Sequence, residues 1–293
     1  MRQRRKMVCA TAAMLSRASR GFDRQMLSSG RGSRLYSAAA EAKRPRSLQA
    51  QGLFSPLQRE NSELPCVAVY DMTRRGPVAY GEAMELQSRL LASRVSNETL
   101  VDGLIIAEHE AVYTLGRGAT EEHVCYDPSE QGAPPLVRTE RGGDVTYHGP
   151  GQLVAYPVLQ LASYKRDSHW YLRALEEVVI RTCKSLGIPD AERHDDHTGV
   201  WLRGHKIAAT GVALRKWVTY HGIALNVSPT MSDFNRIVPC GLHDEQVGCL
   251  KDIDGFHDID LRKDVLPRFL TEFQDVFQAD LTTDKATAHH HTQ

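Results

Sequence analysis

The chain lacks the sequence features that mark several common protein classes. Its 293 residues contain no apolar run close to the ~20 residues that a helix needs to span a bilayer. The formal net charge is zero, so the charge balance indicates neither a nucleic-acid nor a membrane-surface partner. The six cysteines form no CxxC pair, and no Cys/His spacing matches a zinc site. Scattered cysteines in a chain of this length favour a reducing compartment. We therefore expect a globular protein that binds no metal, no nucleic acid and no membrane.

The N-terminal segment has almost no acidic residues. Residues 1–40 are rich in Arg, Ser and Ala, and Asp23 is their single acid. This composition is typical of an organelle transit peptide, whereas a secretory signal would need a continuous apolar core of ~7–15 residues. Arg34-Leu35-Tyr36-Ser37 resembles a matrix-protease cleavage site, so we expect import into the mitochondrial matrix. The alternatives are a plastid address and a basic tail without a targeting role. Residues 41–64 lack periodicity and carry Pro, Gln, Ser and mixed charge, which is typical of a linker.

Apolar periodicity divides the rest of the chain into helices and strands. Helical spacing predicts helices over residues 78–93, 169–186 and 261–276. Short β-prone runs predict strands over residues 66–70, 103–107, 111–115, 153–159, 200–202, 206–214 and 217–227. The last three runs are joined by connections short enough for hairpins. Hairpins mixed with a few helices indicate the α+β class, with a largely antiparallel or mixed sheet and flanking helices. We expect one catalytic domain over residues 65–278 and a polar tail over residues 279–293.

The densest polar segment of the chain is also rich in glycine. Residues 141–152, RGGDVTYHGPGQ, contain four glycines and a proline, which we expect to preclude a regular element. Glycines let the backbone approach a ligand closely and expose N–H groups. A loop of this composition therefore predicts a binding site, and the alternative is a tight structural loop with capping side chains. The segment His194-Asp195-Asp196-His197 contains metal-ligand types, but adjacent residues of one loop converge poorly on one ion.

This glycine-rich segment, followed by Leu153-Val154-Ala155-Tyr156-Pro157, resembles the defining motif of the lipoyl(octanoyl) transferases. Four further segments match the same family in the same order. They are residues 198–201 (TGVW), 205–212 (HKIAATGV), 217–227 (WVTYHGIALNV) and 234–242 (FNRIVPCGL). The resemblance covers roughly residues 66–277, and several long motifs in order are more specific than any one of them.

The resemblance implies the fold shared by lipoate-protein ligases and biotin ligases. It also implies transfer of an octanoyl group from octanoyl-acyl carrier protein, through a cysteine thioester, to a lysine of a lipoyl domain. The acceptors would be the lipoyl domains of 2-oxoacid dehydrogenase complexes and the glycine cleavage H protein. No cofactor is needed, because the thioester donor already stores the activation energy.

The same resemblance assigns roles to individual residues. Cys240, in the Pro-Cys-Gly match, would be the nucleophile, and Lys206, in the Lys-Ile-Ala match, would lower the pKa of its thiol. The acyl pocket would be lined by Arg141, Gly142, Gly143, Asp144, Val145, Thr146, Tyr147 and His148, and completed by Ala209, Thr210, Gly211, Gly222, Ile223 and Ala224. His148 could serve as a pocket wall, as a donor to the thioester carbonyl or as a structural histidine. Cys249 lies where family members more often have Ser.

Physical chemistry gives reasons for a cysteine and a lysine that do not depend on the resemblance. A free thiol with a pKa of ~8.5 is only a few per cent ionised near neutrality, so it needs a nearby cation or helix N-terminus. An ammonium at ~4 Å in an effective dielectric of ~20 supplies about 4 kcal/mol before desolvation is subtracted. A lysine can also move protons, which an arginine does poorly, and the incoming amine must lose a proton to attack.

Three other functions are compatible with parts of the sequence. An ATP-dependent lipoate or biotin ligase of the same fold would activate a free acid as an adenylate, and it would need no nucleophilic cysteine. A lipoyl amidotransferase would use the same Cys240 and Lys206, and the sequence separates it poorly from the transferase. A binding module without catalysis would have no need for either residue, and both are intact.

Overall fold

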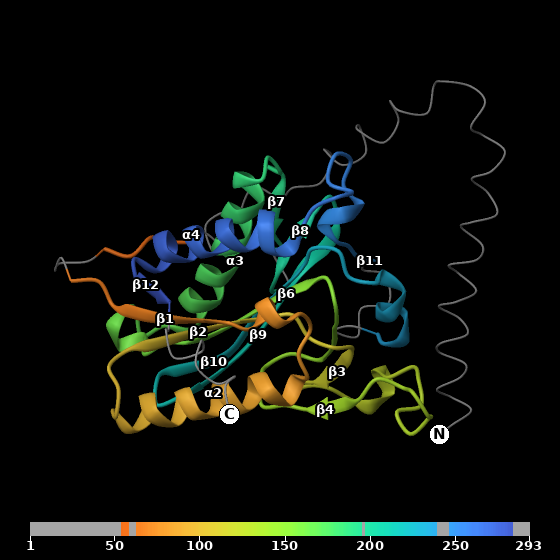
Figure 1. Ribbon diagram of the computed structural model, residues 1–293, viewed down its shortest axis with the longest axis horizontal. Helices are drawn as coiled ribbons and strands as arrows, with labels where there is room; N and C mark the ends of the chain where they lie inside the picture. Colours follow the sequence, from red (N-terminus) through yellow and green to blue (C-terminus); the bar gives the residue numbers. More distant parts are fainter. Residues whose placement is uncertain (1–53, 59–62, 195–196, 239–245, 284–293) are drawn as a thin grey trace, which may run out of the picture. The chain divides into compact units, whose positions relative to one another are not determined.

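The computed structural model describes residues 54–58, 63–194, 197–238 and 246–283 (Figure 1). Its main sheet consists of strands β1 (Cys66–Asp71), β2 (Asp102–Ala107), β6 (Gln152–Val158), β7 (Ala191–Arg193), β8 (Val200–Leu202), β9 (His205–Arg215), β10 (Val218–Asn226), β11 (Gln246–Val247) and β12 (Asp280–Thr283). The strand order is β12-β1-β2-β6-β10-β9-β8-β7, and β11 pairs with β9. Strand β1 is parallel to both β2 and β12, while β2, β6, β10, β9, β8 and β7 pair antiparallel in succession. The predicted α+β class with a mixed, largely antiparallel sheet is confirmed.

A smaller sheet lies beside the main one. It consists of β4 (Leu136–Arg138), β3 (Val112–Leu115) and β5 (Val145–His148), with β3 in the centre. The expectation that glycine and proline keep residues 141–152 out of regular structure is wrong for β5, which pairs antiparallel with β3. The glycines flank this four-residue run, and Val145 and Tyr147 alternate as buried residues within it. Between the glycines, the alternation of buried and less buried side chains therefore favours a strand.

Three helices cover the two faces of the main sheet. They are α2 (Tyr80–Ser96), α3 (Ser168–Ser185) and α4 (Leu266–Phe277), and a π-helical turn at Leu261–Val265 leads into α4. Short 3-10 helices occur at Met72–Arg75, Glu121–His123, Leu161–Ser163, Met231–Arg236 and Leu250–Asp252. Figure 1 shows α2 on one side of the sheet and α3 with α4 on the other.

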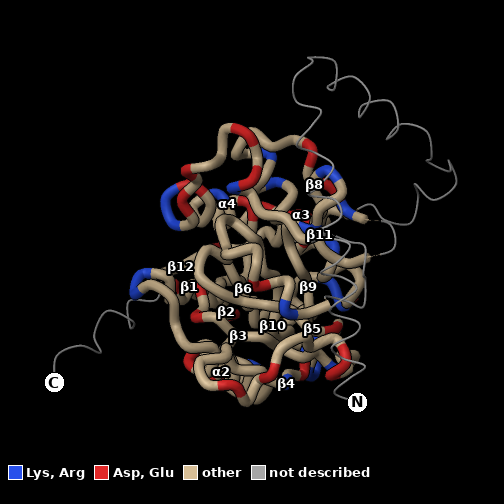
Figure 2. Tube along the Cα trace, turned by 90° about the vertical axis from the view of Figure 1, so that its right-hand side faces the viewer, with Lys and Arg blue, Asp and Glu red and all other residues tan. Residues whose placement is uncertain are grey.

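Strand β2 explains how one sheet supports a core on each face. All six of its residues are buried. Leu104 and Ile106 belong to the core cluster under α3 and α4, whereas Ile105 and Ala107 belong to the cluster under α2. Because successive side chains point to opposite faces, a strand that is covered on both sides needs an unbroken apolar run. In Figure 2 acidic and basic residues are interspersed along the tube, and the sequences of β6 and β10 contain neither.

Most predicted elements agree closely with the structure. Each predicted strand ends within one residue of an observed strand, and the helix predicted over residues 169–186 is α3, shifted by one residue. Helix α3 begins after Asp167, whose carboxylate accepts hydrogen bonds from the amides of His169 and Trp170 at 2.9 and 3.0 Å. This is a standard N-cap. None of the helices in the described ranges combines the length and hydropathy required to cross a bilayer.

Contacts at both ends of the described fold reach beyond the predicted catalytic domain. The ring of Phe54 lies tilted against that of Trp170 with centroids 6.3 Å apart, and the indole Nε1 of Trp170 donates to the carbonyl of Ser55 at 3.0 Å. At the other end, residues 280–283 form strand β12 on β1 rather than part of a polar tail. Strand β12 was missed because it is short and mostly exposed, so its sequence carries no apolar alternation.

Candidate functional site

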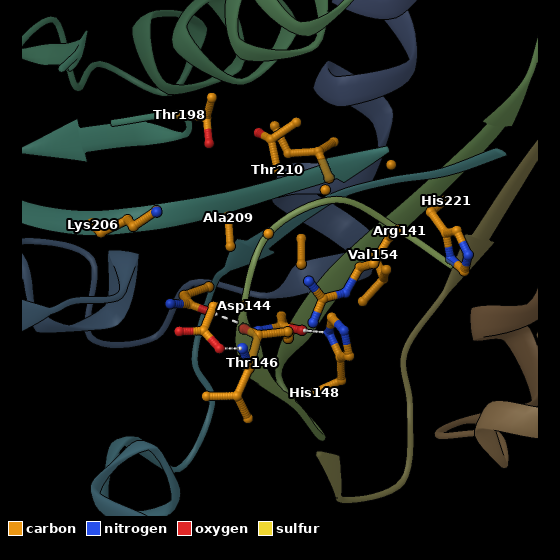
Figure 3. A pocket seen from close by; sticks show the side chains of 18 of the residues that line it. Arg141, Asp144, Thr146, His148, Val154, Thr198, Lys206, Ala209, Thr210 and His221 are labelled. Atoms are coloured by element: carbon orange, nitrogen blue, oxygen red, sulfur yellow. Dashed lines mark hydrogen bonds between the residues drawn. The ribbon is translucent and has the colours of Figure 1, made fainter. Parts of the chain in front are cut away.

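A cavity lies between strands β9 and β10 and the segment that contains β5 (Figure 3). Residues predicted for the site that line it are Arg141, Gly143, Asp144, Val145, Thr146, His148, Lys206, Ala209, Thr210, Gly211, Gly222, Ile223 and Ala224. The remaining lining residues, which were not assigned to the pocket individually although all but Tyr80 and Val247 lie in the family motifs, are Tyr80, Gln152, Val154, Tyr156, Thr198, His221, Asn226, Phe234 and Val247. Gly142 and Tyr147 are not among the lining residues. Cys240 lies outside the described residues.

Two motifs that are separate in the sequence form one wall of this cavity. Ala209, Thr210 and Gly211 on β9 pair with Ala224, Ile223 and Gly222 on β10, in that order. The resulting wall consists mainly of small residues, which leaves room for a ligand between the strands and the glycine-rich segment. Gly222 cannot be replaced without movement, because an added Cβ would overlap the backbone oxygen of Ala155 and lie 2.8 Å from Cδ of Pro157.

Arg141 fastens the glycine-rich segment to strand β3. Its Nη2 donates to the backbone oxygen of Thr114 at 2.8 Å and to the Thr114 hydroxyl at 2.9 Å, and its Nη1 donates to the Gly142 carbonyl at 3.0 Å. The Gly142 amide in turn donates to the Val212 carbonyl of β9 at 3.0 Å. Gly142 therefore helps to build the site through its backbone, although it does not line the cavity.

Tyr147 points away from the cavity, which corrects its predicted role as a pocket residue. Its ring packs in a separate cluster against Tyr113 and Phe234, with ring centroids 5.2 Å from each. Its hydroxyl donates to Oδ2 of Asp233 at 2.9 Å. On β5 the side chains alternate. Thr146 and His148 face the cavity, while Val145 and Tyr147 pack in the hydrophobic cluster that also contains Tyr113 and Leu115 of β3. Val145 also reaches the cavity wall.

His148 is held in one tautomer by a chain of hydrogen bonds. Its Nδ1 lies 2.6 Å from Oε1 of Gln152, whose Nε2 donates to Oδ1 of Asn226 at 2.8 Å and to the carbonyl of Tyr147 at 3.2 Å. Since the Gln152 oxygen can only accept, Nδ1 of His148 carries the proton. Burial, followed by the neighbouring His109, lowers the pKa of His148 to about 3. The imidazole is therefore neutral, and its Nε2 has no proton to donate to a thioester carbonyl.

Two more buried histidines surround His148. His109 contacts the hydroxyl of Tyr156 through Nε2 at 2.8 Å, and burial lowers the pKa of His109 to about 4. Burial also lowers the pKa of His221 to about 4, followed by the charge of Arg141. The rings at this end of the cavity are therefore neutral, and the charge there is that of Arg141, whose guanidinium donates hydrogen bonds to Thr114 and Gly142.

Lys206 lies at the opposite end of the cavity, near the start of β9. Its Nζ is 5.5 Å from the centre of the Trp201 ring, within cation–π range. Gly199 lies against the aliphatic part of this side chain, because an added Cβ there would be 2.7 Å from Cε of Lys206. Val247 pairs with Lys206 in the sheet. In Figure 3 the amine of Lys206 and the ring of His221 lie at opposite sides of the drawn pocket.

Two other thiols have environments that suppress thiolate formation. Burial raises the pKa of Cys183 to about 12. Burial, followed by the hydrogen bond to Asp252, raises the pKa of Cys249 to about 11, and its Sγ donates to Asp252 Oδ2 at 3.2 Å. Both are therefore poor nucleophiles near neutral pH.

The described residues contain no group of three or more His, Cys, Asp or Glu side chains that could hold a metal ion. His194 and His197 have ring centroids 4.9 Å apart, and both rings lie near Trp201. Asp195 and Asp196 of the same segment lie outside the described residues. The histidine pair is therefore an aromatic contact on the Lys206 side of the fold.

The sequence of the chain matches a known protein family. The catalytic-domain model of the lipoyl protein ligase A/B family matches residues 79–274. An octanoyltransferase of Thermosynechococcus vestitus is 48% identical over 202 residues, which cover 69% of this chain and 87% of that protein. A chloroplastic octanoyltransferase of Arabidopsis thaliana is 43% identical over 228 residues, covering 74% of this chain and 79% of the relative.

Solved structures resemble the fold at low sequence identity. A lipoate-protein ligase A bound with ATP has a TM-score of 0.56 at 18% identity, with 77% of this chain and 92% of that chain covered. A bipartite lipoate protein ligase from Thermoplasma acidophilum has a TM-score of 0.52 at 19% identity, with 78% and 90% covered. These likenesses concern the fold alone, and they confirm the predicted similarity to lipoate-protein ligases.

Proposed function

The chain belongs to the lipoyl protein ligase A/B catalytic-domain family as an acyltransferase of the lipoyl(octanoyl) transferase type, and we propose that its octanoyl group passes from acyl carrier protein through a thioester on Cys240. The acceptor in this proposal is a lysine of a lipoyl domain, as in the 2-oxoacid dehydrogenase complexes and the glycine cleavage H protein. The observation that carries the proposal is the cavity itself. It has Lys206 at one end, neutral histidine rings with the hydrogen-bonded Arg141 at the other, and a wall of small residues between them.

The proposed reaction has two half-reactions. In the first, the Cys240 thiolate attacks the carbonyl of the donor thioester, and the carrier departs as its thiol after taking a proton. In the second, the neutral amine of the acceptor lysine attacks the new thioester, its proton passes to Lys206, and Cys240 is released. A thioester reacts readily with both nucleophiles, so the acyl group needs no further activation.

In this proposal Lys206 serves both half-reactions. An ammonium near the thiol favours the thiolate, and a neutral amine can accept a proton from the incoming lysine. Val238, two residues before Cys240, donates its amide to the carbonyl of His123 at 2.8 Å, and Val247 pairs with Lys206. Phe234, before the Cys240 segment, and Val247, after it, both line this cavity.

Intact-mass spectrometry of the protein mixed with octanoyl-acyl carrier protein, without ATP, tests the proposal. We expect one added octanoyl mass that hydroxylamine removes. Cys240→Ser should abolish the adduct. Cys249→Ser is the matched control, and it should leave the adduct unchanged because the Cys249 thiol is buried and hydrogen-bonded to Asp252.

The same experiment separates the alternatives. A strict need for ATP and free octanoate would indicate a ligase, and the structural likeness to an ATP-bound lipoate-protein ligase concerns only the fold. Acylation of Cys240 from an octanoylated lipoyl domain, but not from the carrier protein, would indicate an amidotransferase. An adduct that survives Cys240→Ser would overturn the assignment of the nucleophile.

We also propose that residues 1–40 direct import into the mitochondrial matrix, with cleavage near Tyr36-Ser37. The Arg-rich and acid-poor composition of the segment supports import. A relative named as chloroplastic makes the plastid the organelle to compare. N-terminal sequencing of the protein from purified mitochondria and plastids should find the mature chain in the mitochondrial fraction, starting near residue 37. Recovery of intact Met1 in the cytosol would contradict import.

A further inference from the structure

Asp144 is the single acidic side chain among the described residues that line the cavity. The same described lining contains two basic side chains, Arg141 and Lys206. The Asp144 side chain is 13% exposed. A carboxylate that faces an acyl chain loses water from its charge and gains no partner, which is unfavourable. Contact with an apolar ligand therefore does not explain why an acid occupies this position.

Two hydrogen bonds hold the Asp144 carboxylate in place. Its Oδ1 accepts from the amide of Val145 at 2.7 Å, and its Oδ2 accepts from Nδ1 of His123 at 2.5 Å. A carboxylate has about four lone-pair positions, so these two bonds leave room for a further donor. In Figure 3 the Asp144 side chain is drawn on the Lys206 side of His148. The carboxylate is therefore fixed at the cavity wall and can still accept a hydrogen bond from a ligand.

His123 also contacts the segment that leads to the proposed nucleophile. Its carbonyl accepts a hydrogen bond from the amide of Val238 at 2.8 Å. Cys240 follows two residues after Val238, and two residues of chain span at most about 7 Å. One residue thus binds the Asp144 carboxylate with its side chain and the approach to Cys240 with its backbone. This places the carboxylate on the side of the cavity where the proposed thioester forms.

The second half-reaction brings a positive charge to that thioester. A free lysine has a pKa of ~10.4, so the acceptor side chain arrives as an ammonium near neutral pH. The guanidinium of Arg141 repels an ammonium in the cavity, and so does Lys206 whenever it is protonated. A carboxylate attracts the incoming ammonium and accepts a charge-assisted hydrogen bond from it. Asp144 is the described lining residue that can do this.

We propose that Asp144 binds the ammonium of the acceptor lysine and that His123 positions the Asp144 carboxylate for this contact. This inference rests on the proposed octanoyl transfer and concerns its second half-reaction. The acceptor proton still passes to Lys206 before the amine attacks, so no bond is made or broken at Asp144. The first half-reaction brings no ammonium into the cavity and does not need the carboxylate.

The test measures the two half-reactions separately in the full-length protein. Asp144→Asn keeps an oxygen acceptor and removes the charge. Its octanoyl adduct on Cys240, formed from octanoyl-acyl carrier protein and measured by intact mass, should appear at the wild-type rate. The KM for the lipoyl domain should rise by about tenfold or more, the loss expected for a hydrogen bond to a charged group. Hydroxylamine, a neutral nucleophile, should cleave the adduct at the wild-type rate.

Glu140→Gln is the matched control for the loss of an acid from the same segment. Glu140 accepts a hydrogen bond from the Tyr220 hydroxyl at 2.8 Å and lines a separate cavity beside α2. Its replacement by glutamine keeps an acceptor for Tyr220, so the KM for the lipoyl domain should match wild type.

Two variants of His123 test its positioning role. His123→Phe removes the donor to Asp144, so the KM for the lipoyl domain should rise while adduct formation stays at the wild-type rate. His123→Gln offers a side-chain N–H to the same carboxylate and should restore part of the lost affinity. An equal KM in the two variants would show that the hydrogen bond to Asp144 does not position the carboxylate.

Each outcome of the Asp144 experiment decides the inference. A folded Asp144→Asn variant with the wild-type KM for the lipoyl domain overturns it. An equal loss in adduct formation, hydroxylamine cleavage and transfer also overturns it, because Asp144 would then shape the thioester site. Where Asp144→Asn does not fold, His123→Phe is judged by the same KM. If wild type forms no adduct from the carrier protein, the proposed function fails, which is distinct from normal adduct formation with an unchanged KM.

Discussion

The buried carboxylate of Glu176 on α3 accepts a hydrogen bond from the backbone amide of Gly199 at 2.8 Å. Glu176 is fully buried and is balanced by Arg173 at 2.8 Å and Arg193 at 3.3 Å. Gly199 in turn lies against the side chain of Lys206. A charged residue in the core thus fixes the backbone that packs against the lysine at the cavity edge.

Loss of the Glu176 carboxylate should destabilise the protein and slow the reaction. Glu176→Ala leaves Arg173 and Arg193 without their shared partner and the Gly199 amide without its acceptor. Removing one partner of a buried pair typically costs about 3–5 kcal/mol in the free energy of unfolding. Urea denaturation measures this loss. Glu176→Gln keeps an acceptor for Gly199, so it should retain more activity than Glu176→Ala at a temperature where both are folded. Equal activity in the two variants would show that the hydrogen bond from Gly199 to residue 176 does not affect the reaction.

Gly199→Ala should reduce octanoyl transfer by more than its effect on stability explains. The added Cβ would lie 2.7 Å from Cε of Lys206 at a φ of 119°. Gly204→Ala is the matched control, since Gly204 also has a positive φ, 81°, but has open space around it. Both changes strain the backbone by roughly 1–2 kcal/mol, which thermal denaturation measures. Only Gly199→Ala should lower kcat, by tenfold or more. Similar kcat values in the two variants would contradict a role for this contact.

The sequence predicted the antiparallel centre of the fold because the signals there are local. Strands β8, β9 and β10 are joined by short connections, which predicted the hairpins that pair them. Strand β12 and the Glu176–Gly199 contact depend on residues distant in the sequence. Nothing in the local sequence specifies such partners.

The candidate site was predictable as a set of motifs but not as a geometry. The wall formed by Ala209–Gly211 and Gly222–Ala224 requires the pairing of β9 with β10, which places both motifs side by side. Tyr80 was missed because it lies in an ordinary helix sequence, and His221 lies in a family motif of which only Gly222–Ala224 were assigned to the pocket. Tyr147 was assigned to the pocket because it lies inside the motif, although the alternation of β5 turns it to the other side.

The position of Tyr147 changes what its substitution should do. Tyr147→Ala removes a ring that is 1% exposed, so the free energy of unfolding should fall by about 3–5 kcal/mol. Tyr147→Phe keeps the ring and removes only the hydrogen bond to Asp233, which corresponds to about 0.5–1.5 kcal/mol. Denaturant titration gives both values. The KM for the acyl donor should stay at the wild-type value in Tyr147→Phe. A large rise in that KM would instead show that the Tyr147 hydroxyl takes part in binding the acyl donor.

The buried histidines predict a loss of stability in mild acid. The pKa values of His109 and His221 are lowered to about 4 and that of His148 to about 3, against about 6.5 for an unfolded chain. The unfolded state therefore binds more protons between pH ~6.5 and ~4, so stability present above pH 6.5 falls as the pH is lowered. Each histidine contributes a slope of up to ~1.4 kcal/mol per pH unit.

Urea titrations at several pH values between 7.5 and 4.5 measure this slope. His148→Gln removes one titrating group, so its slope should be smaller than that of wild type. The difference between the two proteins at pH 7.5 gives the packing effect of the substitution, which is subtracted. An unchanged slope in His148→Gln would mean that His148 does not contribute to the acid sensitivity.

The two proposed roles of Lys206 leave different traces in its variants. Lys206→Arg keeps a cation near Cys240 but removes the base, since a guanidinium stays protonated above pH ~12. Iodoacetamide should therefore still alkylate Cys240 near neutral pH, while transfer to the lipoyl domain falls sharply. Lys206→Ala removes both functions, so alkylation of Cys240 should shift to higher pH. Lys251→Ala, which changes an exposed lysine outside the cavity, is the control and should match wild type in both assays.

Raising the pH should restore the two half-reactions of Lys206→Ala to different extents. Acylation of Cys240 needs only a thiolate, which hydroxide can generate. Transfer to the acceptor lysine also needs removal of a proton from the attacking amine at the thioester, and bulk solvent replaces a positioned base poorly. The cysteine adduct, measured by intact mass, should therefore recover more fully than the octanoylated lipoyl domain. If alkylation of Cys240 follows the same pH profile in wild type and Lys206→Ala, Lys206 does not activate the thiol, and the cation must come from another residue of the cavity. Arg141 would then be the residue to test, because among the described lining residues it is the other one with a fixed positive charge.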